Sequence, residues 1–209
     1  MARFILVRHG RTEWNRVERF RGRTDLELDA TGIKQAQATA QRLSEWPVAA
    51  VYSSPLRRAL ATADAMARQC NLKVQVVDGV IDIDYGDWHG LSPEEAAAKD
   101  PRLFSLWLES PHLVRFPHGE SLDDVRKRCA LAVNRLLQKH ASETFVIVSH
   151  KVVCQLIILE LLGLENAFFW RIAQDVCAIN VFEVRNNIPS VVLLNDTCHL
   201  QEMTEEKKN

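Results

Sequence analysis

Short apolar runs alternate along this chain with longer segments whose apolar residues recur every three or four positions. The first apolar runs predict buried strands, at 3–8, 48–54, 72–77 and 144–149. Segments of helical character follow these runs, at 29–46, 55–70, 92–100, 101–110, 120–140 and 150–164. Two further apolar runs, 177–184 and 190–195, flank the turn signal "RNNIP" and predict a closing hairpin.

This repetition of strand, helix and strand predicts an α/β protein. Crossover helices between parallel strands cover both faces of a sheet, so we expect a three-layer α/β/α sandwich with a mostly parallel central sheet. The hairpin is expected to add an antiparallel strand. We expect one domain over residues 1–209, with 80–120 as an excursion over one end of the sheet and the charged residues 200–209 as a flexible tail.

The composition excludes several classes of protein. The chain is 47% hydrophobic and 25% charged with a net charge of −1, which is unlike the basic excess of nucleic-acid-binding proteins. Apolar stretches are too short for a membrane span, and "FILV" is too short for the core of a signal peptide. Five cysteines without metal-ligand spacing indicate free thiols in a reducing cytoplasm and no zinc site.

Charged and titratable residues follow the predicted strands at their carboxyl ends, where open α/β sheets bind ligands. The first strand ends in Arg8 and His9, and the second leads to Arg57 and Arg58. The fourth strand ends at His150. Two histidines and several arginines are therefore expected at one edge of the sheet, although Arg57 or Arg58 alone also fits a solvated surface cation.

These residue types suit phosphoryl transfer. A guanidinium pairs with phosphate through two hydrogen bonds, and a neutral imidazole can attack phosphorus to give a phosphohistidine. The leaving oxygen needs a proton from a carboxyl group. "DGVIDIDYGDWHG" supplies Asp82, Asp84 and Asp87, and the apolar neighbours of Asp82 favour it, although the run also fits a plain acidic turn.

The motif "RHGRTEWN" resembles the signature of the histidine phosphatase superfamily, which has the phosphoglycerate mutase-like fold. The resemblance continues in order through "DLELDATG", "VYSSPLRRALATA", "IDIDYGDWHG", "HGES" and "VSH". It implies His9 as the phosphorylated nucleophile and Asp82 as the general acid. It further implies a phosphate pocket of Arg8, Arg58, His150 and Asn15, and it implies no metal or cofactor.

The chain departs from the pattern of this family at three positions. Asp82 stands where the family usually has Glu, one methylene longer. Arg21 precedes Gly22 where the family often has Gln before Gly, which adds a cation for a substrate carboxylate or a second phosphate. Lys151 stands where the family often has Gly after the second histidine, and it adds positive charge beside the phosphate.

The compact segment between 82 and 150 lacks the longer insertion of the mutases and favours a phosphatase. "LWLESPHLVRFPHGESL" and "LNDTCHL" are most similar to the metal-independent phosphoserine phosphatases, whose C-terminal substrate-binding histidine aligns with His199. Tyr85 replaces a histidine of that branch that serves in substrate recognition. Tyr85 departs from the branch at a position that sets specificity, but the two similar segments still imply a small phosphomonoester as substrate, with phosphoserine favoured.

Other functions stay open on the sequence alone. The alternative substrates are α-ribazole phosphate, sugar phosphates and glucosylphosphoglycerate. A phosphoglycerate mutase and a non-catalytic sensor of phosphorylated ligands are further alternatives. The apolar segments 151–163 and 168–172 fit a homodimer interface as well as a buried core.

Overall fold

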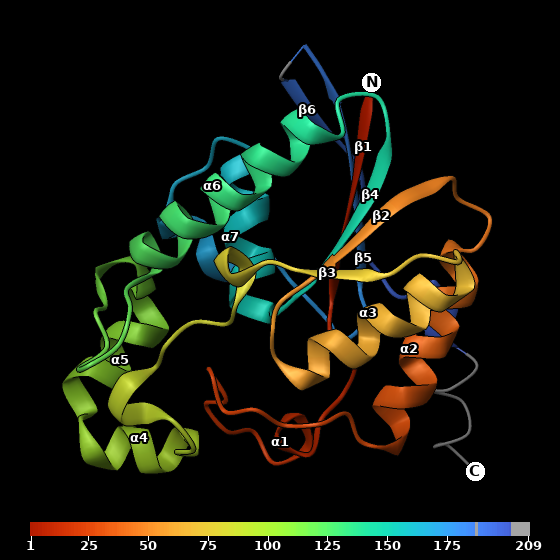
Figure 1. The fold of residues 1–209 in the computed structure, drawn as a ribbon. Coiled ribbons are helices and arrows are strands. Elements are labelled where there is room, and N and C mark those ends of the chain that lie inside the picture. The colour runs from red at the N-terminus through yellow and green to blue at the C-terminus, as the bar shows by residue number, and fades with distance from the viewer. Residues whose placement is uncertain (187, 202–209) are drawn as a thin grey trace.

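Six strands form one sheet in the order β3-β2-β4-β1-β5-β6. The computed structural model describes residues 1–186 and 188–201 (Figure 1). The strands, in chain order, are β1 (Ala2–Arg8), β2 (Val48–Ser53), β3 (Val74–Val76), β4 (Thr144–Ser149), β5 (Ile179–Arg185) and β6 (Ile188–Asp196). The first four run parallel, whereas β5 pairs antiparallel with both β1 and β6. The prediction of a mostly parallel sheet with a closing hairpin is confirmed.

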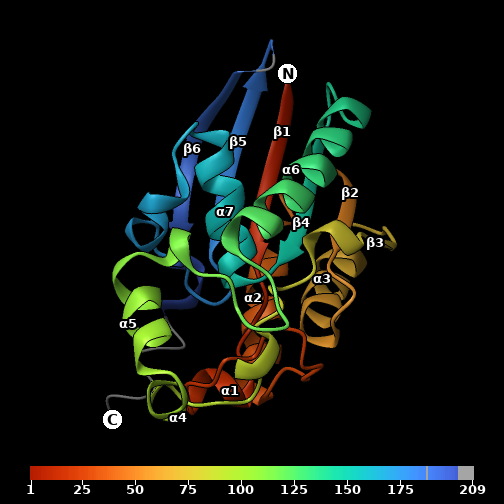
Figure 2. The same cartoon turned by 90° about the vertical axis from the view of Figure 1, so that its left-hand side faces the viewer.

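Helices cover both faces of this sheet. The α-helices of the described residues, in chain order, are α1 (Glu13–Arg16), α2 (Ala30–Leu43), α3 (Arg57–Gln69), α4 (Pro93–Lys99), α5 (Pro101–Glu109), α6 (Leu122–Lys139) and α7 (Lys151–Leu161). In Figure 1, α2 and α3 lie on one side of the sheet and α6 and α7 on the other, and Figure 2 shows α6 and α7 in front of the strands. The three-layer prediction is therefore confirmed.

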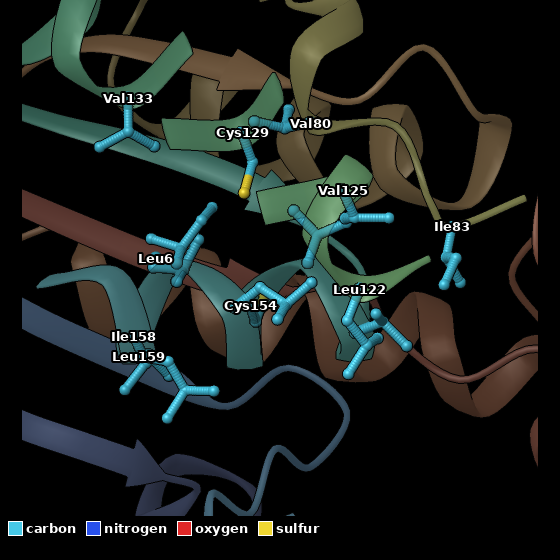
Figure 3. Packing of buried hydrophobic residues seen from close by; sticks show 14 of the residues in the cluster. Leu6, Val80, Ile83, Leu122, Val125, Cys129, Val133, Cys154, Ile158 and Leu159 are labelled. Carbon is cyan, nitrogen blue, oxygen red and sulfur yellow. The ribbon is translucent and has the colours of Figure 1, made fainter. Parts of the chain in front are cut away.

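Strand β1 lies between the two hydrophobic layers of the core. Successive side chains of a strand point to opposite faces. Phe4 and Leu6 accordingly belong to the cluster that includes residues of α6 and α7, whereas Ile5 and Val7 belong to the cluster with α2 and α3. Figure 3 shows Leu6 in the first cluster, near Cys154 of α7. This continuous burial is why the run "FILV" has no polar position.

Segment 78–121 leaves the sheet after β3 and carries α4 and α5. Both figures place α4 and α5 toward the end of the sheet at which β1 finishes (Figures 1 and 2). Three aromatic residues of the segment, Trp88, Trp107 and Phe116, pack edge to face or nearly so, with Phe116 5.2 Å from each of the other two rings. That the chain forms a single domain stays a prediction.

The structure differs from the sequence prediction in short elements. Helix α1 begins at Glu13 in the "RTEWN" motif, with four residues between it and β1, and was not expected. Leu200 is buried in a 3-10 helix, Cys198–Leu200, that packs against α2, so the expected tail is wrong at its first residue. Residues 202–209 of that tail lie outside the described part of the chain. Within the described part, no helix is long and apolar enough to cross a membrane.

Candidate active site

Parallel pairing brings the ends of three strands together. The His9 amide directly after β1 donates to the Ser149 carbonyl at the end of β4, at 2.9 Å. Ser54, directly after β2, donates its amide to Val148 of β4 at 3.0 Å. As a result the rings of His9 and His150 lie 5.2 Å apart between centroids. The two histidines expected at one edge of the sheet are neighbours.

His9 is held as a neutral imidazole. It is 1% exposed, and its Nδ1 lies 2.7 Å from the Gly10 carbonyl oxygen. A carbonyl can only accept, so Nδ1 carries the proton and Nε2 keeps its lone pair. Burial, followed by the charges of Arg58 and Arg8, holds the pKa of His9 well below its ordinary value of 6.5. At neutral pH this ring is therefore a nucleophile.

His150 is the N-terminal cap residue of α7 and is fully buried beside His9. Its Nε2 forms a 2.7 Å hydrogen bond with the Ser54 hydroxyl. Its Nδ1 lies 3.5 Å from a carboxylate oxygen of Asp82 without a hydrogen bond. Burial and the charge of Arg58 lower the pKa of His150 as well. Ser54 thus orients the second ring, leaving Nδ1 toward Asp82.

Arg58 lies in the first turn of α3 and is fully buried. It donates to the carbonyls of Gly22 and Thr24, each at 2.7 Å, and to Asp82 at 2.9 Å. Its neighbour Arg57 is exposed and pairs with Glu27 on the surface. The structure therefore brings Arg58, and not Arg57, to the histidines.

Asp82 lies between Arg58 and His150. One carboxylate oxygen accepts from the Ile83 amide at 2.9 Å, and the other accepts from Arg58. Asp84, the alternative acid, instead accepts from the Gly86 amide and pairs with Arg23 at 3.3 Å. Of the two carboxyl groups, Asp82 is the one placed beside the histidines.

Arg8 is anchored from behind by a buried amide network. Its guanidinium donates to the Gln174 carbonyl oxygen at 2.6 Å. The side chains of Gln174 and Asn180 exchange two hydrogen bonds of 2.8 and 2.9 Å, and Asn180 also donates to Leu6 of β1. This network fixes the carbonyl that holds Arg8. Sequence reasoning missed it, because a contact through a backbone oxygen leaves no residue signature.

Four buried nitrogen atoms near His9 lack a hydrogen-bond partner within the described residues: the Nε–H donors of Arg8, Arg21 and Arg58, and Nδ1 of His150. Leaving a buried donor unpaired costs about 1–3 kcal/mol. Burial and the nearby Arg21 also lower the pKa of Arg8 to about 10, as expected for crowded cations without a counterion. This arrangement is built for an anion.

A pocket of about 540 Å³ reaches Arg8 and Arg21 of this cluster, whereas the buried residues His9, Arg58 and His150 are not part of its lining. It is lined by Arg8 and Asp82 and by the expected substrate-binding residues Asn15, Arg21, Gly22, Tyr85 and Lys151. His199 does not line it, and instead its Nε2 lies 3.0 Å from the Thr39 hydroxyl on α2. The structure thus gathers every expected substrate-binding residue except His199.

Asn15 and Gly22 fix the backbone of the chain that lines the pocket after β1. The Asn15 side-chain oxygen accepts from the Thr12 amide and hydroxyl, both at 2.9 Å. These contacts occupy only the oxygen of the side chain, and its NH₂ group is not used by them. Gly22 has φ +46°, and a Cβ there would lie 2.2 Å from the His89 ring. Only glycine fits this turn, which aims the Gly22 carbonyl at Arg58.

Two tryptophans are among the residues of the pocket wall that the sequence analysis did not identify. Trp107 of α5 and Trp170 both line it, and the Trp170 indole donates to the Trp107 carbonyl at 3.0 Å. The signal for them was weak, because aromatic residues in helical segments usually pack in a core. Elsewhere in the described residues, no cluster of three His, Cys, Asp or Glu side chains could hold a metal ion.

Comparison with known proteins identifies the family of this chain. The model of the histidine phosphatase superfamily (branch 1) matches residues 4–197, and the chain belongs to this superfamily. The particular relatives are phosphatases: phosphoserine phosphatase 1 of Hydrogenobacter thermophilus is 39% identical over 99% of this chain and 98% of the relative. The metal-independent phosphoserine phosphatase of Arabidopsis thaliana is 33% identical over 96% and 84%. The predicted family and enzyme class are confirmed.

Solved structures share the whole fold. YhfR of Bacillus stearothermophilus superposes with a TM-score of 0.92 at 28% identity, covering 96% of this chain and all of the other. The phosphoserine phosphatase of Entamoeba histolytica, in complex with 3-phosphoglyceric acid, superposes with a TM-score of 0.87 at 32% identity, with the same coverage. The phosphoglycerate mutase-like fold inferred from the motifs is therefore confirmed.

The amide network behind Arg8 predicts a specific loss of phosphate binding. We expect Asn180→Leu to lower kcat/KM for p-nitrophenyl phosphate about 10-fold. Without Asn180 the Gln174 carbonyl is no longer fixed, so the Arg8 guanidinium is held less firmly in the position that binds phosphate. The inhibition constant for inorganic phosphate should rise in parallel. The exposed Asn134→Leu on α6 is the matched control. An unchanged phosphate inhibition constant would show that the network only supports the fold.

The lowered pKa values of His9 and His150 predict how stability depends on pH. When unfolded, both rings regain a pKa near 6.5, so below that pH the unfolded chain binds more protons than the native chain. The free energy of unfolding should therefore fall between about pH 7 and 5.5, by up to about 1.4 kcal/mol per pH unit for each histidine. Urea unfolding at several pH values measures this dependence. His9→Gln should lower the slope of the free energy of unfolding against pH by the contribution of about one proton. An unaltered slope in that variant would contradict the assignment.

Proposed function

We propose that this enzyme is a metal-independent phosphoserine phosphatase that works through a phosphohistidine at His9. The observation that carries the proposal is the group of unpaired buried donors around a neutral imidazole. Support comes from the two phosphoserine phosphatases that align over most of their length, one of them metal-independent by name. A solved structure of the Entamoeba histolytica enzyme, 31% identical, contains phosphoserine.

In the first step, Nε2 of His9 attacks phosphorus and the bond from phosphorus to the serine oxygen breaks. Arg8, Arg58 and His150 donate to the other phosphoryl oxygens and stabilise the charge that they carry in the transition state. Asp82 in its protonated form delivers its proton to the departing oxygen, so serine leaves as the neutral alcohol and Asp82 becomes the carboxylate that pairs with Arg58.

In the second step, the Asp82 carboxylate accepts a proton from water as the water oxygen attacks phosphorus. The bond from phosphorus to Nε2 breaks, and inorganic phosphate and neutral His9 result. Asp82 is again protonated, so one cycle consumes one water and regenerates every group. This reversal of roles needs the acid within reach of both oxygens, as its place between Arg58 and His150 allows.

The buried free thiols at positions 129, 154 and 177 suit a reducing cytoplasm, where we place the enzyme. The apolar residues of α7 are buried in the core, which accounts for that segment without an interface. A homodimer stays a prediction that sedimentation would test.

A hydrolysis screen tests the substrate. We expect phosphoserine to be preferred over α-ribazole phosphate, glucosylphosphoglycerate and sugar phosphates, and EDTA to leave the rate unchanged. His9→Gln should lower the rate on the order of 1,000-fold or more, since removing a nucleophile costs at least that much, while circular dichroism stays native. Preference for another monoester would replace phosphoserine, interconversion of phosphoglycerates would indicate a mutase, and no turnover at all would indicate a sensor.

The acid role of Asp82 predicts a dependence on the leaving group. Serine leaves as a basic alkoxide and needs a proton, whereas p-nitrophenolate leaves without one. We expect Asp82→Asn to lower kcat for phosphoserine roughly 100-fold or more and for p-nitrophenyl phosphate much less. Equal losses on both substrates would show that Asp82 only orients Arg58. Asp84→Asn is the matched comparison and should show no such contrast.

A further inference from the structure

Five cations line the pocket together with three carboxylates, which are those of Glu18, Asp82 and Asp175. Two of its arginines have partners outside the reacting centre: Arg11 pairs with Asp29 at 2.7 Å and Arg19 with Glu95 at 3.0 Å. The remaining pocket cations form no ion pair within the described residues, and they are Arg8, Arg21 and Lys151. Arg8 belongs to the phosphate clamp, the group of Arg8, Arg58 and His150 that donates to the phosphoryl oxygens. Arg21 and Lys151 take no part in the proposed reaction steps.

Arg21 is fixed in the wall of the pocket. Its guanidinium donates to the Trp14 carbonyl at 2.9 Å, while its Nε is buried without a partner. One terminal nitrogen of the guanidinium is therefore fixed by Trp14, and Nε is a charged donor without a partner in the described structure. Burial lowers the pKa of Arg21, and the negative charge of Asp82 opposes that shift, so the two groups lie close enough to interact.

Lys151 is the first residue of α7 and lines the same pocket. Its Nζ lies 5.8 Å from the centre of the Trp170 ring, which keeps the ammonium over the aromatic wall. Burial, followed by the charges of Arg8 and Arg21, lowers the pKa of Lys151. Asp175 and Glu18 also line the pocket and oppose this shift, but neither forms an ion pair with Lys151 in the described structure. The ammonium therefore lacks an ion-pair partner.

A phosphate bound by Arg8 and Arg58 leaves Arg21 and Lys151 without an ion-pair partner in the described structure, so a second anionic group on the same substrate would supply one. We propose that Arg21 and Lys151 form a carboxylate-binding subsite beside the phosphate clamp. The substrates it selects are phosphomonoesters that carry a carboxylate a few bonds from the ester oxygen. This inference rests on the proposed function, because phosphoserine is one member of that class.

Matched ligands test the subsite without turnover. 3-Phosphoglycerate and glycerol 3-phosphate differ only where a carboxylate replaces a hydroxymethyl group, and the His9→Gln background leaves both intact. By calorimetry we expect added Lys151→Gln to raise Kd for 3-phosphoglycerate roughly 10- to 100-fold, as for a lost charged hydrogen bond. Kd for glycerol 3-phosphate and for inorganic phosphate should change less than about 3-fold. Arg21→Gln should act in the same direction, and Lys73→Gln, exposed before β3, is the control.

Several results would overturn the subsite. Equal losses for both ligands would show that Lys151 only strengthens phosphate binding, and equal affinities before the substitution would show that the carboxylate is not recognised. Failure to bind either ligand would also reject it. The proposed function fails differently, by an absence of phosphoserine hydrolysis in the unmodified enzyme, and a selective loss of 3-phosphoglycerate binding would then still establish the subsite.

Discussion

The hydrogen-bonded pairing of β1 with β4 is the constraint on which the site depends. Their register sets Arg8 opposite Ser149, so that the residues following each strand, His9 and His150, emerge side by side. Both strands are buried on two faces and cannot slip without moving apolar side chains out of the core. The positions of the two rings are therefore set by the packing of the whole sheet, and a loop could not hold them as rigidly.

The stability of the core also makes an unfavourable arrangement of charge tolerable. Arg58 is fully buried and Arg8 nearly so, and unpaired donors remain on both. Such groups persist because surrounding carbonyls, including those of Gln174 and Gly22, satisfy the other guanidinium donors. The binding of an anion would relieve the remaining cost. The site is thus arranged for the bound state before the ligand arrives.

The sequence predicted the sheet and the reacting groups because both follow from local patterns. A buried parallel strand reads as an apolar run, and its carboxyl end places Arg8 and His9 at the ligand edge. The Gln174–Asn180 pair could not be predicted, because it joins residues through a turn and acts on a backbone oxygen. His199 packs on α2 through a short helix that carries no periodic signal. Residues that react were thus easier to find than residues that hold them.

The hydrogen bond from Nδ1 of His9 to the Gly10 carbonyl has a consequence for the second half of the cycle. Once Nε2 carries the phosphoryl group, the ring is a cation, because Nδ1 still holds its proton. Such a ring departs from phosphorus as neutral imidazole, a far better leaving group than the imidazolate that a ring without that proton would become. One backbone oxygen thereby makes the nitrogen ready to attack and keeps the resulting intermediate short-lived.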